Sequence, residues 1–491
     1  MIVLLNDLLQ KVEYEKVIHE RNAEIGGLSA DSKHIMDGDM FICFKGGDSD
    51  GHDFAAEAVA AGAVAVVCER ECDLPVCQIV VKNGRRAMSE FARAFYGNPA
   101  AKMKMIGITG TNGKTTTAHM LASILNKAGK NCALIGTLGV FYANREIAPA
   151  LTTPDPIFLH KTFADMVECG VEYVVMEVSA HAVYFDKIEG IRFACCIFTN
   201  CTEDHLDFFK DMESYAAAKK SLFTPERCNL AIVNTDDAVG ASLTGGKVRT
   251  YGYALENPAD VFAIDVRESV RGSRFVLNLF DDLYEIDLHM TGKHNVYNAM
   301  AAAACAKLLG VGTEEIGKGL AALDKVNGRL EYVTAYRGAD IFVDFAHTPD
   351  GLEKSLCALK PHCKGRLICV FGCGGNRDRQ KRPIMGAAAG KLADFTVLTS
   401  DNPRYEDPFD IIVQIETGLR EHSKNYVIVA DREKAIDYGI NMLAKGDILF
   451  IAGKGGETYQ EIMGVRHIYS DVSVIRSILR EKTSGGEKRE N

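Results

Sequence analysis

A glycine-rich stretch with one lysine and several hydroxyls carries the residue types most suited to chemistry. Residues 107–117 read Gly-Ile-Thr-Gly-Thr-Asn-Gly-Lys-Thr-Thr-Thr, between an apolar run (103–108) and a helical pattern (120–125). In this order, loop amides and a helix N-terminus can surround phosphate oxygens, the lysine can reach the β- and γ-phosphates, and the next hydroxyl can bind Mg²⁺. We therefore predict an ATP-binding loop formed by Gly110, Thr111, Asn112, Gly113, Lys114, Thr115 and Thr116.

The common form of such a loop has Gly or Ala where this chain has Ile108, so a plain glycine turn is the alternative interpretation. Two further polar clusters each follow a predicted strand: 176–181, which contains Glu177, and 199–207, which contains His205. Ligands of α/β sheets bind at the carboxyl ends of strands. A single histidine is more often structural, but three clusters on strands of one unit favour a shared site.

An alanine-rich helix, predicted over 215–223, carries the paired lysines Lys219 and Lys220. A solvated basic face is the simpler interpretation. Alternatively, a lysine close to other cations has a lowered pKa, and its neutral amine can add CO₂ to give a metal-binding carbamate. The residues alone leave both interpretations open.

The bulk composition indicates a large cytoplasmic enzyme. The chain has 491 residues, a net charge of -10 and dispersed lysines and arginines, which argues against a nucleic-acid partner. No apolar run is long enough to span a membrane, the start lacks the features of a secretory signal, and the 15 cysteines contain no Cys-x-x-Cys pair. We expect reduced thiols, a monomer and no integral membrane association.

Alternating apolar strands and helices predict an α/β protein of three domains. The first covers residues 1–98, with strands at 40–44, 63–68 and 78–81. The second, 99–327, combines a mainly parallel sheet (173–178, 193–198, 230–233) with hairpins at 260–290 and a helix from about 292. The third, 328–491, alternates strands (341–345, 367–371, 395–399, 426–430, 448–451) with helices in a doubly wound pattern, and its polar tail 482–491 is predicted to be disordered.

Taken together, the motifs resemble the Mur ligase family, whose pattern they follow in order and spacing over essentially the whole chain. They are Thr109–Thr116, Glu177-Val-Ser, Asp204–Asp207, Ala218-Lys219, Gly292-x-x-Asn295-x-x-Asn298, Gly328-Arg329 and Asp344–Pro349. The resemblance implies an ATP-dependent, ADP-forming amide ligase of peptidoglycan precursor synthesis. It also implies an N-terminal UDP-substrate domain, a central P-loop ATPase domain and a C-terminal Rossmann-like domain for the amino acid.

Within the family, Ser400-Asp-Asn-Pro-Arg404 resembles the element of the members that add meso-diaminopimelate to the glutamyl carboxylate of a UDP-linked muramoyl dipeptide. Diaminopimelate ends in a carboxylate and an ammonium where lysine has only the ammonium. The planar guanidinium of Arg404 suits that carboxylate, and Asp401 or Asn402 suits the ammonium. A turn with a solvated arginine is the alternative. The resemblance assigns to the diaminopimelate pocket Arg377, Asp401, Asn402, Pro403, Arg404, Gly453 and Glu457.

The resemblance implies roles for the remaining candidates as well. Mg²⁺ would be held by Thr115, Glu177, His205 and Lys219 as its carbamate, and the implied catalytic residues are Lys114, Glu177, His205, Lys219 and His347. The nucleotide would also contact Asn295, Arg329 and Asp344, with His347 nearby. In the UDP-linked substrate, uridine would contact Ser32, with Gly47, Asp48 and Ser49 nearby. The muramoyl dipeptide would contact Thr152, Thr153 and Ser179, and Lys187 is a further candidate for this substrate.

One departure from the pattern concerns the UDP-linked substrate. Some members have Gln-x-Arg where this chain has Phe185-Asp-Lys187. Lysine keeps the charge without the bidentate geometry, and phenylalanine makes no hydrogen bond, so the share of these positions in binding stays open. The alternatives for the whole chain are addition of lysine, a folylpolyglutamate synthase-like ligase, and a P-loop ATPase that acts as a switch.

Overall fold

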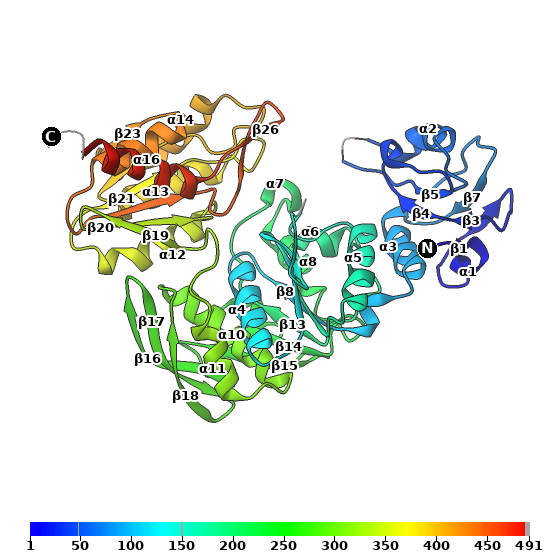
Figure 1. The fold of residues 1–491 in the computed structure, drawn as a ribbon, viewed down its shortest axis with the longest axis horizontal. Coiled ribbons are helices and arrows are strands. Elements are labelled where there is room, and N and C mark those ends of the chain that lie inside the picture. The colour runs from blue at the N-terminus through cyan, green and yellow to red at the C-terminus, as the bar shows by residue number, and fades with distance from the viewer. Residues whose placement is uncertain (48, 149–150, 487–491) are drawn as a thin grey trace.

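The computed structural model describes residues 1–47, 49–148 and 151–486, and arranges them around three α/β sheets (Figure 1). The three sheets follow one another along the chain, as the alternating pattern predicts, so the predicted fold class is confirmed. The N-terminal part lies on the right of Figure 1, the middle part in the centre and the C-terminal part at the upper left. Domain borders at 98 and 327 remain a proposal.

The N-terminal part is a five-stranded sheet in the order β2-β7-β6-β5-β4, with all pairs parallel except β2 with β7. The three strands predicted from the sequence are β5, β6 and β7. Its elements are β1 (Val3–Leu4), α1 (Leu5–Leu9), β2 (Lys16–Ile18), β3 (Glu24–Ile25), β4 (Gly27–Ser29), η1 (Ser32–His34), β5 (Asp39–Ile42), η2 (Gly51–Phe54), α2 (Ala55–Ala60), β6 (Ala65–Cys68), β7 (Cys77–Val80) and α3 (Gly84–Phe95).

The middle part is built on an eleven-stranded sheet in the order β11-β10-β9-β12-β8-β13-β14-β15-β16-β17-β18. The strands from β9 to β16 run parallel, and antiparallel hairpins extend the sheet at both ends. Alternate residues of β8 pack into different cores: Ile106 and Ile108 on one face, Met105 on the other. Burial of both faces explains why these strands are continuous apolar runs.

The helices of the middle part cover both faces of its sheet. The strands are β8 (Lys104–Thr109), β9 (Cys132–Gly136), β10 (Gly139–Tyr142), β11 (Arg145–Ile147), β12 (Tyr173–Glu177), β13 (Cys195–Phe198), β14 (Leu230–Asn234), β15 (Arg249–Ala254), β16 (Val261–Ser269), β17 (Gly272–Leu279) and β18 (Asp282–Leu288). The helices are η3 (Pro99–Lys102), α4 (Lys114–Lys127), α5 (Pro156–Glu168), α6 (Ala180–Tyr184), α7 (Leu206–Phe209), α8 (Met212–Lys220), α9 (Ala238–Ala241), α10 (Lys293–Leu308) and α11 (Thr313–Ala321).

The C-terminal part has a six-stranded sheet in the order β19-β20-β24-β21-β22-β23, parallel from β20 onward. Each of the five strands predicted from the sequence is present. Its elements are β19 (Glu331–Tyr336), β20 (Ala339–Asp344), α12 (Pro349–Leu359), η4 (Lys360–His362), β21 (Leu367–Phe371), α13 (Lys381–Leu392), β22 (Phe395–Leu398), α14 (Pro408–Leu419), β23 (Tyr426–Ile428), α15 (Arg432–Asn441), β24 (Ile448–Ala452), β25 (Tyr459–Ile462), β26 (Val465–Ile468) and α16 (Asp471–Gly486).

The C-terminal tail is helical further along the chain than the sequence predicts. Residues 482–486, predicted to be disordered, continue α16, and 487–491 lie outside the described residues. The helix persists because its first turns pack on the sheet, with Ile475 fully buried in the core. All 15 cysteines are free, as predicted. Within the described ranges, no helix is long and apolar enough to cross a membrane.

Candidate active site

The glycine loop joins β8 to α4, the arrangement that the sequence predicts. Gly110 has φ 147° and Gly113 φ 87°, both in the region that favours glycine. A Cβ on Gly110 would lie 1.9 Å from Thr199 Oγ1, and one on Gly113 would lie 2.5 Å from Asn298 Oδ1. The loop therefore has no room for side chains at these two positions.

Asn200, which follows the neighbouring strand β13, holds the rest of the loop through hydrogen bonds. The Thr111 amide donates to Asn200 O and the Asn112 amide to Asn200 Oδ1, both at 2.9 Å. Lys114 Nζ donates to the carbonyls of Gly110 (2.7 Å) and Thr111 (2.9 Å). Burial lowers the pKa of the Lys114 ammonium, and Glu177 and Asp204 oppose that effect. Thr116 is buried.

A carboxylate at the end of β12 lies at the centre of the site. Thr115 Oγ1 donates to Glu177 Oε2 at 3.0 Å, and the Thr137 amide and hydroxyl donate to the same carboxylate at 2.8 and 3.1 Å. Thr137 Oγ1 lies 3.1 Å from Thr152 Oγ1. One short chain of hydrogen bonds thus connects the predicted ATP loop with a predicted contact of the UDP-linked substrate.

Two more predicted substrate contacts flank Glu177. Thr153 Oγ1 donates to Glu177 O at 2.8 Å and accepts from the Ser179 amide at 3.0 Å. Ser179 Oγ caps α6 by accepting from the Ala182 amide. Thr152, Thr153 and Ser179 therefore lie close to the loop, and their contacts with substrate stay a prediction.

On the other side of the loop, α10 supplies a ladder of amides. Thr117 Oγ1 donates to Asn298 Oδ1 at 3.1 Å, Asn298 Nδ2 to Asn295 Oδ1 at 3.1 Å, and Asn295 Nδ2 to Thr291 O at 2.8 Å. Asn295 and Asn298 are both buried. This ladder fixes α10 against α4. Asn298 contacts Thr117 of α4 directly, and Asn295 is connected to α4 only through Asn298.

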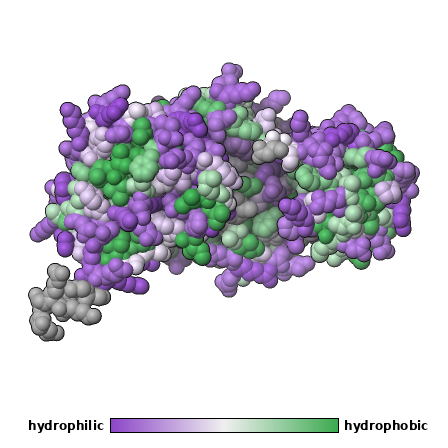
Figure 2. All heavy atoms as spheres, turned by 90° about the horizontal axis from the view of Figure 1, so that it is seen from above, coloured by the Kyte–Doolittle hydropathy of each residue, from purple (hydrophilic) through white to green (hydrophobic). Residues whose placement is uncertain are grey.

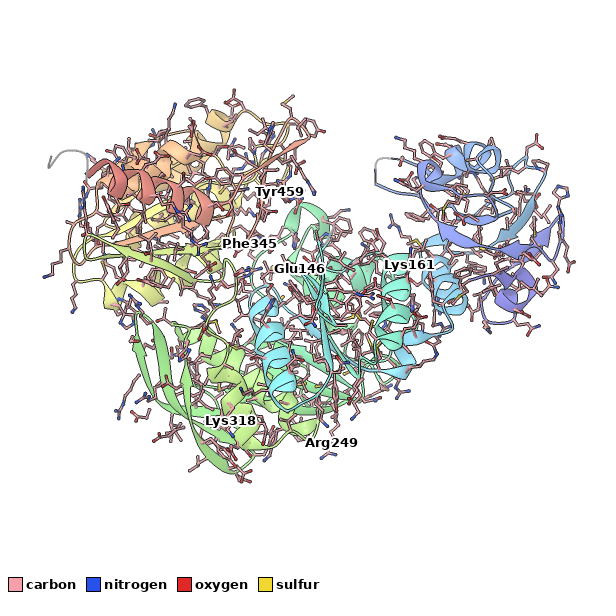
Figure 3. The ribbon with its side chains drawn as sticks, in the orientation of Figure 1. Glu146, Lys161, Arg249, Lys318, Phe345 and Tyr459 are labelled. Atoms are coloured by element: carbon pink, nitrogen blue, oxygen red, sulfur yellow. The ribbon has the colours of Figure 1, made fainter. Side chains whose placement is uncertain are left out.

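The segment that begins the C-terminal part reaches back to the ATP loop. Arg329 Nη2 donates to Thr115 Oγ1 at 3.0 Å, and its guanidinium lies 4.5 Å from the centre of the Phe345 ring. Phe345 and Tyr459 are labelled in Figure 3, on the side of the C-terminal part turned toward the middle part. Asn112 Nδ2 also donates to Asp350 Oδ2 at 2.7 Å. Both contacts hold the last part against the loop.

Asp344 and His347 differ in their hydrogen-bond partners. Asp344 accepts from the Ala346 amide at 2.9 Å and from Ser355 Oγ at 3.1 Å, so it organises the turn after β20. Burial lowers the pKa of His347 to about 4, with Lys381 contributing, and its Nδ1 lies 2.8 Å from Phe345 O. His347 is therefore neutral at pH 7.

His205 lies in a group of rings and charges at the carboxyl end of β13. Its Nε2 is 3.4 Å from Asp204 Oδ2, and its ring centre is 4.8 Å from that of His181. Burial lowers the pKa of His205 to about 3. Burial alone would raise the pKa of Asp204, but His205, His347 and the nearby lysines outweigh it and lower that pKa.

Lys219 is buried on α8, whereas Lys220 is only partly buried. Lys219 Nζ lies 3.4 Å from the centre of the Tyr215 ring. Burial, together with the charge of Lys114, lowers the Lys219 pKa well below its usual value. The solvated-face interpretation is therefore wrong for Lys219, because its side chain is buried and makes no part of a solvated surface.

Few side chains of the site are placed to hold Mg²⁺ together. Among the described residues, no three His, Cys, Asp or Glu side chains form a group that could hold a metal. Mg²⁺ at phosphates, however, is held by one or two protein oxygens, with waters and phosphate oxygens completing the shell. The hydroxyl of Thr115 beside the carboxylate of Glu177 fits that pattern.

The predicted diaminopimelate pocket lies where β22, β24 and β25 meet. Asn402 Nδ2 donates to Glu457 Oε2 at 2.9 Å, and Asn402 Oδ1 accepts from Lys454 Nζ at 2.8 Å. Lys454 also pairs with Glu457 at 2.9 Å. A Cβ on Gly453 (φ 112°) would lie 2.5 Å from Asp401 Oδ2. This buried oxygen has no hydrogen-bond partner in the described part of the chain, and Arg432 Nη1 lies 3.9 Å from it.

Arg404 lies at the mouth of this group, on a backbone with φ 52° that pairs with β25. Its Nη1 donates to Gly375 O at 2.8 Å, and its Nε lies 3.4 Å from Glu461 Oε2. Partial burial lowers the pKa of Arg377, and the positive charge of the nearby Arg404 lowers it further. Pro403 is buried beside Gly375. Arg404 and Arg377 thus lie close together beside Glu461 and Asp207, and both guanidinium groups are candidates to bind an anionic group.

The predicted uridine contact, Ser32, lies in the N-terminal part, and the further candidate Lys187 lies in the middle part. Ser32 begins η1, is buried and donates from Oγ to Glu57 Oε2 at 3.2 Å, while Gly47 and Ser49 are exposed. Asp48 lies outside the described residues. Lys187 pairs with Asp155 at 2.7 Å. Figure 2, with the N-terminal part at the right, shows the surface hollowed between that part and the rest.

Several side chains at these places were not singled out from the sequence. They are Thr137, Asp350, Lys381 and Lys454. Lys454 stands between Gly453 and Glu457, so their spacing could have drawn attention to it. Nothing in the sequence marks Thr137 or Asp350, because their partners are distant along the chain.

Comparisons with known proteins place this geometry in a family. Family models match residues 24–96 (Mur ligase family, catalytic domain), 108–306 (Mur ligase middle domain) and 328–455 (Mur ligase, glutamate ligase domain). Because these models and the relatives described next cover nearly the whole chain, the chain belongs to the Mur ligase family.

Two curated relatives and one solved structure have similar names. UDP-N-acetylmuramoyl-L-alanyl-D-glutamate--2,6-diaminopimelate ligase 1 of Clostridium acetobutylicum is 43% identical over 480 residues, covering 96% of this chain and 98% of the relative. The Halalkalibacterium halodurans enzyme named as that ligase is 41% identical, covering 98% and 100%. A solved structure of such a ligase is 31% identical with a TM-score of 0.69, covering 98% and 100%.

Proposed function

We propose that this chain is an ATP-dependent ligase that adds meso-2,6-diaminopimelate to the D-glutamyl carboxylate of UDP-linked N-acetylmuramoyl-L-Ala-D-Glu, as its relatives are named to do. The observation that carries the proposal is the chain of hydrogen bonds from Thr115 through Glu177 and Thr137 to Thr152. The glycine loop thus lies beside residues that the resemblance assigns to the acceptor, which supports the proposal. A ligase needs this proximity, whereas an ATPase switch does not.

In the first step, an oxygen of the glutamyl carboxylate attacks the γ-phosphorus of ATP, and the bond to ADP breaks. Both reacting groups are anionic, so the protein must neutralise charge and align them. Lys114 and Arg329 are the cations nearest the loop, and Lys114 would exchange its loop carbonyls for phosphate oxygens. Mg²⁺, held by Thr115 and Glu177, would supply further positive charge.

In the second step, the amine of diaminopimelate attacks the acyl carbon and loses a proton, and the tetrahedral intermediate expels phosphate. The amine pocket and the loop belong to different parts of the chain, joined by the contacts of Arg329 and Asp350. These contacts hold the amine donor close to the acyl phosphate, which reduces the entropy lost on reaction. The catalytic roles of Glu177, His205, Lys219 and His347 belong to this proposal.

The buried position of Lys219 supports the proposed carbamate. The nucleophilic form of a lysine is its free amine, and burial favours that form here. A carbamate would carry a negative charge beside the cationic loop, where a second ammonium would be repelled. We further propose that the protein is a monomer and that it works in the cytoplasm; the 15 free thiols support the location.

The deciding experiment is an amide-forming assay with ATP, UDP-linked muramoyl dipeptide and either diaminopimelate or lysine. We expect ADP and the diaminopimelate tripeptide in equal amounts, with little product from lysine. ATP hydrolysis independent of the acid and the amine would favour the switch instead. Equal use of both amines would leave a Mur-type ligase with a different specificity.

A folylpolyglutamate synthase-like activity is disfavoured by the N-terminal part. The family model matched at residues 24–96 is one of Mur ligases, and this part holds the residues assigned to uridine. Glutamate and a folate offered in place of the two substrates should give no product.

A further inference from the structure

Arg85 lies at the seam between the N-terminal and middle parts of the molecule. Its guanidinium carbon is 4.6 Å from the centre of the Phe44 ring and 4.3 Å from that of the Phe185 ring. Phe44 follows β5 in the N-terminal part, and Phe185 ends α6 in the middle part. The cation is therefore held between aromatic rings from two parts of the chain.

Contacts of this kind use the charge of the guanidinium and not its N–H groups, so those groups of Arg85 stay available to donate. Among the described residues, the side chain makes one hydrogen bond, from Nη2 to Lys45 O at 3.1 Å, and no ion pair. Burial lowers the pKa of Arg85, and Asp155 and Glu69 are near enough to oppose this without pairing with it. The adjacent Arg86, by contrast, pairs with Glu90 and Glu189. Arg85 thus presents a rigid edge of donors suited to an anion.

The position of Arg85 indicates which anion that is. Its acceptor Lys45 begins the loop of Gly47 and Ser49, which the resemblance assigns to the UDP-linked substrate near Ser32, the uridine contact. Its stacking partner Phe185 ends the helix that Ser179, assigned to the muramoyl dipeptide, caps. In the substrate, a diphosphate joins uridine to the muramoyl sugar. The diphosphate must therefore run between these two sets of residues, where Arg85 lies.

We propose that Arg85, clamped between Phe44 and Phe185, binds the diphosphate of the UDP-linked substrate, an inference that rests on the proposed function. It also explains the departure at position 185. A phenylalanine there makes no hydrogen bond of its own, but it orients an arginine whose planar donors replace those missing at Phe185 and Lys187. Arg85 is then a specificity-determining residue of the substrate site.

The test compares UDP with uridine as probes, measuring each dissociation constant by calorimetry. Loss of one charged, bidentate contact should weaken binding at least about tenfold, or 1.4 kcal/mol. We expect Arg85→Ala to weaken UDP by that factor and to leave uridine within about twofold of wild type. Arg86→Ala is the matched control: it removes a neighbouring charge and a contact between the same two parts, and should change neither constant.

Two outcomes would overturn the proposal: unchanged affinity for UDP in Arg85→Ala, or an equal loss for UDP and uridine, which would mean that Arg85 only holds the two parts together. Arg85→Lys repeats the comparison if the alanine variant does not fold, because lysine keeps a charge between the rings but lacks the fork. In turnover, KM for the UDP-linked dipeptide should rise while KM for ATP does not. If wild type binds UDP but forms no amide, the proposed function fails while the role of Arg85 in binding diphosphate stands.

Discussion

Replacement of Arg404 tests what selects the third amino acid. The two candidate amines react at identical ends and differ in the distal carboxylate, so only groups that contact that end can distinguish them. Arg404 is mostly buried, with one donor used by Gly375 O and Nε turned to Glu461. Its remaining N–H groups can receive the carboxylate of diaminopimelate, while lysine would leave them unpaired.

The expected size of the effect follows from these contacts. A hydrogen bond to a charged group contributes about 1.5–3 kcal/mol, which is roughly 10- to 150-fold in kcat/KM. Arg404→Ala should lose that much with diaminopimelate and little with lysine. Arginine and alanine at position 404 are equally strained at φ 52°, because each has a Cβ. The substitution is therefore not expected to change the stability of the backbone here. KM for ATP should stay unchanged.

Steady-state kinetics with both amines, run in parallel on wild type and variant, give the result. Arg379→Ala is the matched control: its guanidinium is exposed and pairs with Glu406, which keeps its contacts with Arg382 after the change. A ratio of diaminopimelate to lysine that is the same in Arg404→Ala as in wild type would refute the reasoning. Residues 401–404 would then be a turn with no part in selection.

Three further predictions concern charge. Lys114→Ala should remove ligation by at least about a hundredfold while circular dichroism and Tm stay native, because a cation at the transferring phosphoryl is lost; near-normal turnover would reject the ATP site. Lys219→Ala should lose most activity and recover part of it with added formate or acetate, while Lys220→Ala should not; mass spectrometry of intact wild type under CO₂ checks the carbamate directly. Burial lowers the pKa of His160 to about 4, whereas the unfolded pKa is about 6.5. His160 therefore contributes stability above pH 6.5 that is lost as pH falls toward 4, by up to about 3 kcal/mol. Urea unfolding of His160→Leu should show a flatter pH dependence, and an unchanged slope would contradict the assignment.

The strands and the glycine loop could be predicted because their causes are local. Strands buried on both faces must be apolar along their length, and the loop needs glycine where φ is positive or a Cβ would collide. The hairpins β9–β11 escaped prediction. Gly136 and Gly139 mark the turn between β9 and β10, but the run before them reads equally well as a helix end.

The contacts that assemble the site could not be found in this way. Arg329 meets Thr115 across 214 positions of sequence, and Asn112 meets Asp350 across 238. No pattern of residue types specifies which polar groups meet over such separations, because the partners are decided by how whole sheets pack. The burial of Lys219 likewise depends on tertiary packing. On the same helix, Lys219 is buried while Lys220 is partly exposed.

The hydroxyl of Thr115 illustrates how closely these distant parts are coupled. A hydroxyl has one hydrogen to donate and two lone pairs. Thr115 gives its hydrogen to Glu177 and accepts from Arg329, which leaves one lone pair for a ligand of the ATP loop. The acceptor side, through Glu177, and the C-terminal part, through Arg329, therefore both orient the group that would receive the nucleotide's metal ion. A change in either part alters the direction of that lone pair, so nucleotide binding and the placement of the C-terminal part depend on each other through a single oxygen.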